Sequence, residues 1–151
     1  RSLFVLGENK RIDFFQYIFL GITICISYSL IGAHFELSEN PILGALDSSV
    51  ESMILSFITV CILAPVLEEF VYRGVLYSFL KKVGLNVFFL ILVSTALFTA
   101  VHSHYDTADL TFVFVLGLLV AYARVRTDGL LIPIAIHFIV NLYGYILVVL
   151  F

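Results

Sequence analysis

Two adjacent glutamates and an arginine stand inside a very apolar part of this chain. Residues 67–74 read LEEFVYRG, and the residues on both sides of them are mostly aliphatic or aromatic. On a helix, Glu69 and Arg73 are four positions apart and can pair, with the acid N-terminal to the base in the favoured order. Glu68 points about 100° away from Glu69 on such a helix. Its carboxylate is therefore left free for another role.

Polar residues at the same four-residue spacing occur in two later apolar segments. Phe98 and His102 lie in FTAVHSH, and His137 and Asn141 lie in HFIVN. A single histidine on an apolar helix is more often a hydrogen-bonded structural residue than a catalyst. Two of them, together with an asparagine and an unpaired glutamate, favour one shared site. We expect His104 to lie in a loop after the helix that carries His102.

These residue types can hydrolyse a peptide bond. A glutamate that is hydrogen-bonded to water and to a histidine can act as a general base. A histidine and an asparagine one turn apart can donate hydrogen bonds to an oxyanion as it forms. Glu68, His102 and His137 would also be a zinc-binding set with an open position for water. The residues leave both chemistries open, and the sequence contains no HExxH, GxSxG or CxxC motif.

The composition places these residues in a membrane. The chain is 62% hydrophobic and 13% charged, with a mean hydropathy of +1.11, whereas soluble domains carry about 25% charged residues. At about 20 residues per crossing, the length allows about five transmembrane helices. We therefore expect an all-α integral membrane protein that forms a single domain over residues 1–151.

Five apolar segments are the expected transmembrane helices, and the second one decides the location of the glutamates. A helix that ended at Leu67 would leave Glu68 and Glu69 in water, as an ordinary charged helix end. The apolar residues that follow instead favour a helix that continues to Lys82, with a kink at Pro65. Glu68 then lies about 20 Å from Lys82, inside a hydrocarbon core of about 30 Å, where an ionisable residue suggests a functional site. The five segments cover about 14–33, 50–82, 85–101, 110–123 and 130–151.

The charged residues predict the orientation in the membrane. The Lys and Arg residues fall into three groups, and five crossings place these groups on one side of the membrane. The other connections contain Asp and Glu but no Lys or Arg. The positive-inside rule then puts the N-terminus in the cytoplasm and the C-terminus outside, in what we expect to be the plasma membrane. The basic groups are Arg1, Lys10 and Arg11; Arg73, Lys81 and Lys82; and Arg124 and Arg126. The acidic connections hold Glu36, Glu39, Asp47 and Glu51, then Asp106 and Asp109.

Two smaller expectations concern processing and the cysteines. Residue 1 is Arg, so we expect a fragment or a processed chain. No cleavable signal peptide is predicted, because the first apolar run begins only after Asp13 and is long enough to span. Cys25 and Cys61 lie in apolar runs without metal or disulfide spacing, and we predict that they are buried thiols.

The three polar motifs resemble those of a family of intramembrane proteases. EEFVYR, from Glu68 to Arg73, resembles the EExxxR motif of the CAAX protease and bacteriocin-processing family (CPBP, also called Abi). FTAVH, which ends at His102, resembles the FxxxH motif of that family, and HFIVN, from His137 to Asn141, resembles its HxxxN motif. The order and spacing also match, and the resemblance covers about residues 49–144.

This resemblance implies an all-α membrane bundle with intramembrane endopeptidase activity. Glu68 would be the general base and would hold the attacking water together with His102. His137 and Asn141 would bind the oxyanion. Glu69 and Arg73 would brace the site, and Phe98 would pack beside it.

The resemblance leaves the cofactor and the substrate open. Family members have been classed as metalloproteases, but the same residues also suit a metal-free water activated by glutamate. We expect a peptide or lipidated-protein substrate, contact with membrane lipids and no nucleic-acid partner. Prenylated C-terminal peptides are the eukaryotic substrates of the family, and bacterial members are linked to peptide processing, bacteriocin immunity and scaffolding. The alternatives are a non-catalytic immunity or scaffold protein and a proton-coupled transporter that uses Glu68 as its protonatable group.

Overall fold

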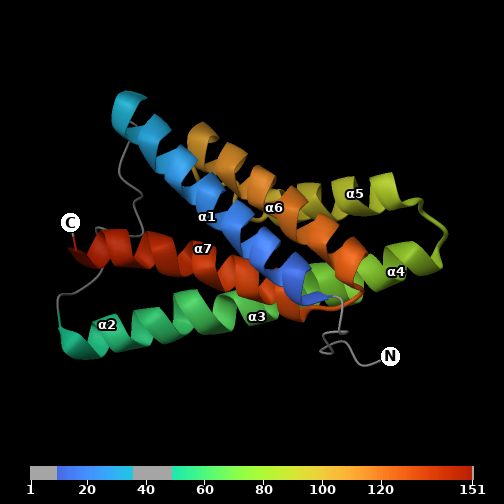
Figure 1. The fold of residues 1–151 in the computed structure, drawn as a ribbon, viewed down its shortest axis with the longest axis horizontal. Helices are drawn as coiled ribbons and strands as arrows, with labels where there is room; N and C mark the ends of the chain where they lie inside the picture. Colours follow the sequence, from blue (N-terminus) through green and yellow to red (C-terminus); the bar gives the residue numbers. More distant parts are fainter. Residues whose placement is uncertain (1–9, 36–48, 151) are drawn as a thin grey trace.

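The fold is an all-α bundle, as predicted. A computed structural model describes residues 10–35 and 49–150, and no strand occurs within these ranges (Figure 1). Two of the segments, η1 and η2, are π-helical, so that their backbone N–H groups reach five residues back instead of four. The elements are α1 (Lys10–Phe35), α2 (Val50–Ser56), η1 (Phe57–Leu63), α3 (Ala64–Glu69), η2 (Phe70–Leu76), α4 (Tyr77–Lys82), α5 (Val87–Ala100), α6 (Thr107–Thr127) and α7 (Leu131–Leu150).

The segments α2 to α4 form one uninterrupted helix of 33 residues, Val50–Lys82. The helix passes through both glutamates, so the alternative in which it ends at Leu67 is wrong. It also continues across Pro65, where the irregularity takes the form of the π-helical segment η1 directly before α3. At 1.5 Å per residue the helix is about 50 Å long, which exceeds the hydrocarbon core of about 30 Å. It must therefore tilt or extend beyond the membrane.

The end of this helix has a clear local cause. Gly84 adopts a positive φ of 89°, which a glycine tolerates without strain. The Leu85 N–H donates to the Leu80 carbonyl at 3.2 Å, and the Gly84 N–H donates to the Lys81 carbonyl at 3.2 Å. This pair of bonds is a Schellman motif, which satisfies the carbonyls at a helix C-terminus. The stop predicted near Lys82 is confirmed.

The following helices begin at side-chain caps. The Asn86 side chain accepts a hydrogen bond from the Phe89 N–H at 3.1 Å and starts α5. The Asp106 carboxylate accepts one from the Asp109 N–H at 2.8 Å and starts α6. Both residues are favoured N-caps because a short polar side chain can satisfy a free N–H of the first turn.

Four of the helical stretches within the described residues are long and apolar enough to cross a membrane. The helix α5 is apolar too, but its 14 residues span only about 21 Å. The third predicted segment is thus a helix, and it is shorter than the hydrocarbon core. The four long stretches are Phe14–Gly32, Val50–Lys82, Thr107–Thr127 and Leu131–Val149.

The core lies where α1, α6 and α7 meet. Its buried members are mostly aliphatic and include the thiol of Cys25, while Cys61 is buried on η1. Both cysteines are free, as predicted. The helix α5 packs against α6, and α7 also packs against η1 and α3. The central cluster consists of Cys25, Leu116, Leu119, Val120, Ala123, Ile132, Ile136 and Val140.

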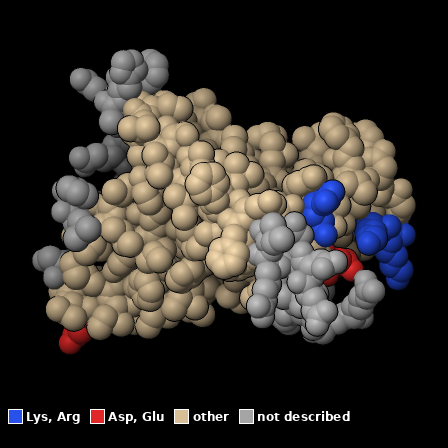
Figure 2. Space-filling view, viewed as in Figure 1, with Lys and Arg blue, Asp and Glu red and all other residues tan. Residues whose placement is uncertain are grey.

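Most of the visible surface carries no charge. Figure 2 shows the Lys and Arg side chains of this face gathered at the end where α4 lies, beside a broad uncharged area. Two of the arginines that the sequence assigned to the basic groups, Arg73 and Arg124, are instead buried at 0% and 5% exposure. Of the other predicted charges, Arg1, Glu36, Glu39 and Asp47 lie outside the described residues.

Candidate active site

Three predicted site residues form a fully buried ionic cluster. The Oε1 atom of Glu69 accepts a hydrogen bond from Nη1 of Arg73 at 3.1 Å, so the predicted pair is present. The same oxygen lies 3.0 Å from Nδ1 of His137 on α7. Because a carboxylate only accepts hydrogen bonds, Nδ1 must carry the proton in this contact. The contact between Glu69 and His137 was not predicted.

The Arg73 guanidinium is held on three sides. Its Nη2 donates to the Gly117 carbonyl of α6 at 3.1 Å, and its central carbon lies 4.4 Å from the centre of the Phe98 ring. A Cβ atom on Gly117 would lie 2.9 Å from Cγ2 of Thr95, so the absence of a side chain lets α5, α6 and the guanidinium approach one another closely. A buried charge requires such partners, because desolvation is otherwise very costly.

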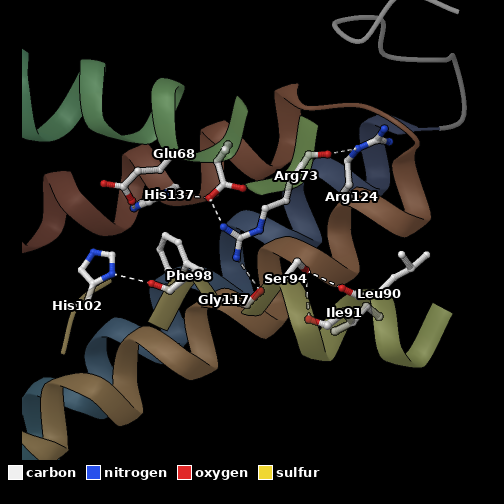
Figure 3. A network of polar contacts seen from close by, with 11 residues as sticks. Glu68, Arg73, Leu90, Ile91, Ser94, Phe98, His102, Gly117, Arg124 and His137 are labelled. Carbon is white, nitrogen blue, oxygen red and sulfur yellow. Dashed lines mark hydrogen bonds and ion pairs between the residues drawn. The ribbon is translucent and has the colours of Figure 1, made fainter. Parts of the chain in front are cut away.

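The neighbouring carboxylate of Glu68 is in a different situation. Its side chain is 30% exposed, and its Oε2 lies 3.8 Å from Nε2 of His137, which is longer than a hydrogen bond. No described residue donates a hydrogen bond to this oxygen. Glu69 is therefore paired with Arg73 and fully buried, whereas Glu68 is partly exposed and has only the more distant contact with His137, in line with the sequence analysis. In Figure 3 the carboxylate of Glu68 lies beside His137.

His102 is connected to this cluster through Phe98. The prediction placed it on the third helix, but α5 ends at Ala100 and His102 lies in the turn that follows. Its Nδ1 lies 2.9 Å from the Phe98 carbonyl, which only accepts, so Nδ1 carries the proton and Nε2 of the neutral ring keeps a lone pair. The Phe98 ring lies 5.0 Å from the His102 ring and 5.8 Å from the His137 ring, so it connects the two histidines as a packing residue (Figure 3).

The same turn contains His104, as predicted, and a tyrosine beside it. The rings of His104 and Tyr105 are 4.4 Å apart, and those of His102 and Tyr105 are 5.4 Å apart. Burial, together with the negative charges of Asp109 and Glu68, raises the pKa of Tyr105 above its usual value. The phenol therefore stays protonated at neutral pH and can donate a hydrogen bond near His102.

Asn141 lies one turn beyond His137 on α7 and contacts the long helix. Its Nδ2 donates a hydrogen bond of 2.9 Å to the backbone carbonyl of Val60 in η1. An asparagine amide has two N–H groups, so one of them is used in this bond and one is left for another acceptor. The contact with Val60 was not predicted.

The described residues do not offer a ready metal site. No group of three His, Cys, Asp or Glu side chains within this part of the chain lies close enough together to hold an ion. In both histidines of the predicted zinc set Nδ1 is engaged, by Glu69 in His137 and by the Phe98 carbonyl in His102, so Nε2 is the nitrogen of each ring that could bind an ion. The three side chains of the predicted set, Glu68, His102 and His137, do not come together as a metal-binding group in the described residues.

Arg124 was missed as a contributor to this region. Its Nε donates to the Arg73 carbonyl at 2.9 Å, and its guanidinium lies 4.9 Å from the centre of the Tyr77 ring (Figure 3). Its Nη1 also forms an ion pair with Asp128 at 3.1 Å. In the sequence, Arg124 resembles any basic residue at the end of a helix, and no local pattern separates it from Arg126. Gly117 had a weak signal, because small residues on apolar helices often mark close helix packing.

Comparison with known proteins adds a family and two relatives. The model of the family described as "Type II CAAX prenyl endopeptidase Rce1-like" matches residues 50–143. The chain is 29% identical over 137 residues to the "Uncharacterized 24.3 kDa protein" of Escherichia coli, an alignment that covers 88% of this chain and 63% of that protein. It is 30% identical over 127 residues to the "Putative membrane peptidase YdiL" of Bacillus subtilis, with 84% of this chain and 50% of that protein covered. The chain thus spans between half and two thirds of the length of these relatives. No solved structure matches it significantly.

Proposed function

The chain belongs to the Rce1-like family of type II CAAX prenyl endopeptidases, and on that premise we propose that it is an intramembrane endopeptidase. The reaction is the hydrolysis of a peptide bond by a water that a glutamate activates. The observation that best supports it is the difference between the two adjacent glutamates. Glu69 is fully buried and contacts Arg73 and His137 at 3.1 Å and 3.0 Å, whereas the Glu68 side chain is 30% exposed and lies 3.8 Å from the nearest nitrogen of His137.

In the first step Glu68 acts as the general base. Its carboxylate takes a proton from water while the water oxygen bonds to the scissile carbonyl carbon. The Nε2 lone pair of His102 is a second acceptor that can orient this water, because Nδ1 donates to the Phe98 carbonyl. The protonated Glu68 then returns the proton to the leaving nitrogen as the C–N bond breaks.

In the second part of the mechanism His137 and Asn141 stabilise the oxyanion. Nδ1–H of His137 is engaged by Glu69, so Nε2 can donate to the oxyanion only when the ring carries both protons. Asn141 contributes the N–H that Val60 does not use. Preorganised donors of this kind are worth about 10²–10³ in rate for each one removed.

The substrate follows from the membrane location and the family. We propose a peptide or a lipidated protein that reaches the site within the membrane, where it also contacts lipids. The apolar, uncharged surface of the bundle supports entry from the bilayer. The family description names prenyl endopeptidases, so a prenylated C-terminal peptide is the first substrate to test, with the same peptide lacking the prenyl group beside it.

The experiment compares the native protein with Glu68→Gln in detergent and in liposomes. Cleavage of the two peptides and of a peptide library is followed by mass spectrometry, and the thermal stability of both proteins is measured. We expect Glu68→Gln to lower cleavage by about 10²–10⁴, as for a lost general base, with unchanged folding. Full cleavage by a folded Glu68→Gln protein would refute the mechanism. A native protein that binds but never cleaves would instead support the scaffold alternative.

A further inference from the structure

Each of the two π-helical segments on either side of the glutamates has a backbone carbonyl that binds a side chain from another helix. A π-helical turn shifts the hydrogen-bond register, and such turns are frequent at functional sites. Along the long helix, η1 comes directly before α3 and η2 directly after it, and α3 carries Glu68 and Glu69. In η1 the carbonyl is that of Val60, and in η2 it is that of Arg73.

In η1 the free carbonyl results from a proline. The Ala64 N–H donates to the Thr59 carbonyl, five residues back. In the same register the donor for the Val60 carbonyl would be the N–H of residue 65, but this residue is Pro65 and has none. The Nδ2 of Asn141 takes that place at 2.9 Å.

In η2 the shift of the hydrogen-bond register leaves the Arg73 carbonyl out of the helix hydrogen bond that Tyr77 would form in a regular α-helix. The Tyr77 N–H is directed at the carbonyls of Tyr72 and Gly74, and so passes over that of Arg73. The Nε of Arg124 donates to the Arg73 carbonyl at 2.9 Å. Figure 3 shows this bond from α6 to the residue that also pairs with Glu69. A backbone carbonyl in a membrane requires a hydrogen-bond donor. The bonds to the Val60 and Arg73 carbonyls therefore hold the side chains of Asn141 and Arg124 in position.

We propose that Pro65 is a positioning residue, which holds the Asn141 amide in place by leaving the Val60 carbonyl without a backbone donor. This inference rests on the proposed function, in which Asn141 donates to the oxyanion. Pro65 does not touch the substrate in this scheme and acts only through Asn141. The contact fixes one N–H of the amide on Val60, which orients the other N–H before the substrate arrives.

Replacing the proline tests the proposal, because Pro65→Ala supplies the missing N–H. In either register a backbone N–H then competes with Asn141 for the Val60 carbonyl: that of residue 65 if η1 stays π-helical, or that of Ala64 if η1 closes into a regular α-helix. We expect kcat for peptide cleavage to fall by about tenfold, less than for a complete loss of an oxyanion donor. KM should change little, because the lost interaction is made mainly in the transition state. The melting temperature should stay the same or rise, since a helix hydrogen bond is restored.

A matched control is Pro133→Ala. Pro133 is also buried in an apolar helix, but it lies in the first turn of α7, where the N–H of its position has no partner within the helix. The substitution therefore frees no contact of the kind seen at Val60. We expect kcat to be retained. A fall in kcat for both variants together would show a general response to proline removal and would overturn the inference.

A double-mutant cycle tests whether Pro65 acts through Asn141. Asn141→Ala alone should lower kcat by about 10²–10³, and the addition of Pro65→Ala to it should have no further effect. If the double variant lowered kcat by the product of the two separate factors, the two residues would act independently, and the inference would be refuted.

A readout without catalysis separates this inference from the proposed function. In protein labelled with ¹⁵N-asparagine, the side-chain amide signal of Asn141 is identified by its loss in Asn141→Ala. We expect this signal to shift, and its proton exchange to speed up, in Pro65→Ala but not in Pro133→Ala. An unchanged signal in Pro65→Ala would refute the inference even if cleavage is confirmed. If the native protein cleaves no peptide, the proposed function fails, and this signal still shows whether the proline holds the amide.

Discussion

At the scale of residues, adjacent carboxylates of the same type have distinct surroundings. Glu69 is fully buried and shares one oxygen between Arg73 and His137. Glu68 is 30% exposed, and its Oε2 lies 3.8 Å from Nε2 of His137. A helix turns about 100° per residue, so neighbours in sequence face different environments. Mutation should therefore separate the two.

Glu69→Gln and Arg73→Ala should destabilise the protein. Each substitution breaks the buried pair and leaves a charge without its partner, which costs about 3–5 kcal/mol when desolvation is complete. The melting temperature in detergent should fall for both, whereas that of Glu68→Gln should not. Equal melting temperatures for all three variants would contradict the division of roles.

Removal of metal ions should leave the activity unchanged. The predicted zinc ligands Glu68, His102 and His137 do not come together as three ligands in the described part of the chain. Dialysis against a chelator, followed by the peptide assay, is the measurement. Activity that disappears on dialysis and returns with added zinc would contradict the metal-free mechanism.

At the scale of elements, the position of the site depends on how closely α5 and α6 pack. Gly117 lies at the contact between these helices, and its carbonyl accepts the hydrogen bond from Arg73. The long helix contributes the rest through η1, α3 and η2, whose changes of register place the glutamates relative to α7. A small displacement at Gly117 would therefore be transmitted to the ion pair.

Gly117→Ala should lower both stability and cleavage. The new Cβ would lie 2.9 Å from Cγ2 of Thr95 and 3.3 Å from the Phe98 ring, so α5 or α6 must shift. Overpacking of this kind costs about 1–3 kcal/mol. The melting temperature and the cleavage rate are the measurements.

The control is Gly144→Ala on α7, where a Cβ meets nothing within 4 Å. This change should be neutral or stabilise the helix by about 1 kcal/mol. If Gly117→Ala were as stable as Gly144→Ala, the close approach of α5 and α6 would not matter for the site.

At the scale of the whole molecule, the orientation in the membrane depends on α5. The basic residues share one side only if the chain crosses between Lys82 and Asp106, yet α5 has 14 residues. A short apolar helix can cross a locally thinned bilayer, at a modest free-energy cost for each ångström of mismatch. The charge distribution favours a crossing, and we keep this as a prediction.

Cysteine labelling tests this orientation. In a variant without Cys25 and Cys61, a single cysteine is placed at Lys82 or at Ser103, on the two sides of α5. An impermeant thiol reagent should reach Lys82→Cys only from the cytoplasmic side and Ser103→Cys only from the outside. Labelling of both from one side would mean that α5 enters the membrane without crossing it.

Features that depend on composition or on a single helix could be predicted from the sequence. The membrane bundle follows from hydropathy, and the pairing of Glu69 with Arg73 follows from a spacing of four. The helix through both glutamates could be predicted because apolar residues continue to Lys82. Each of these depends on residues close together in the chain, where helix geometry is regular.

The contacts between groups from different helices could be seen only once the helices were packed. The contacts of His137 with Glu69, Asn141 with Val60, and Arg124 with the Arg73 carbonyl join residues 51 to 81 positions apart. They depend on how each helix is rotated about its axis and on the register shifts in η1 and η2. A π-helical turn breaks the regular spacing from which sequence predictions are made, so the partners across it become clear only once the helices are packed.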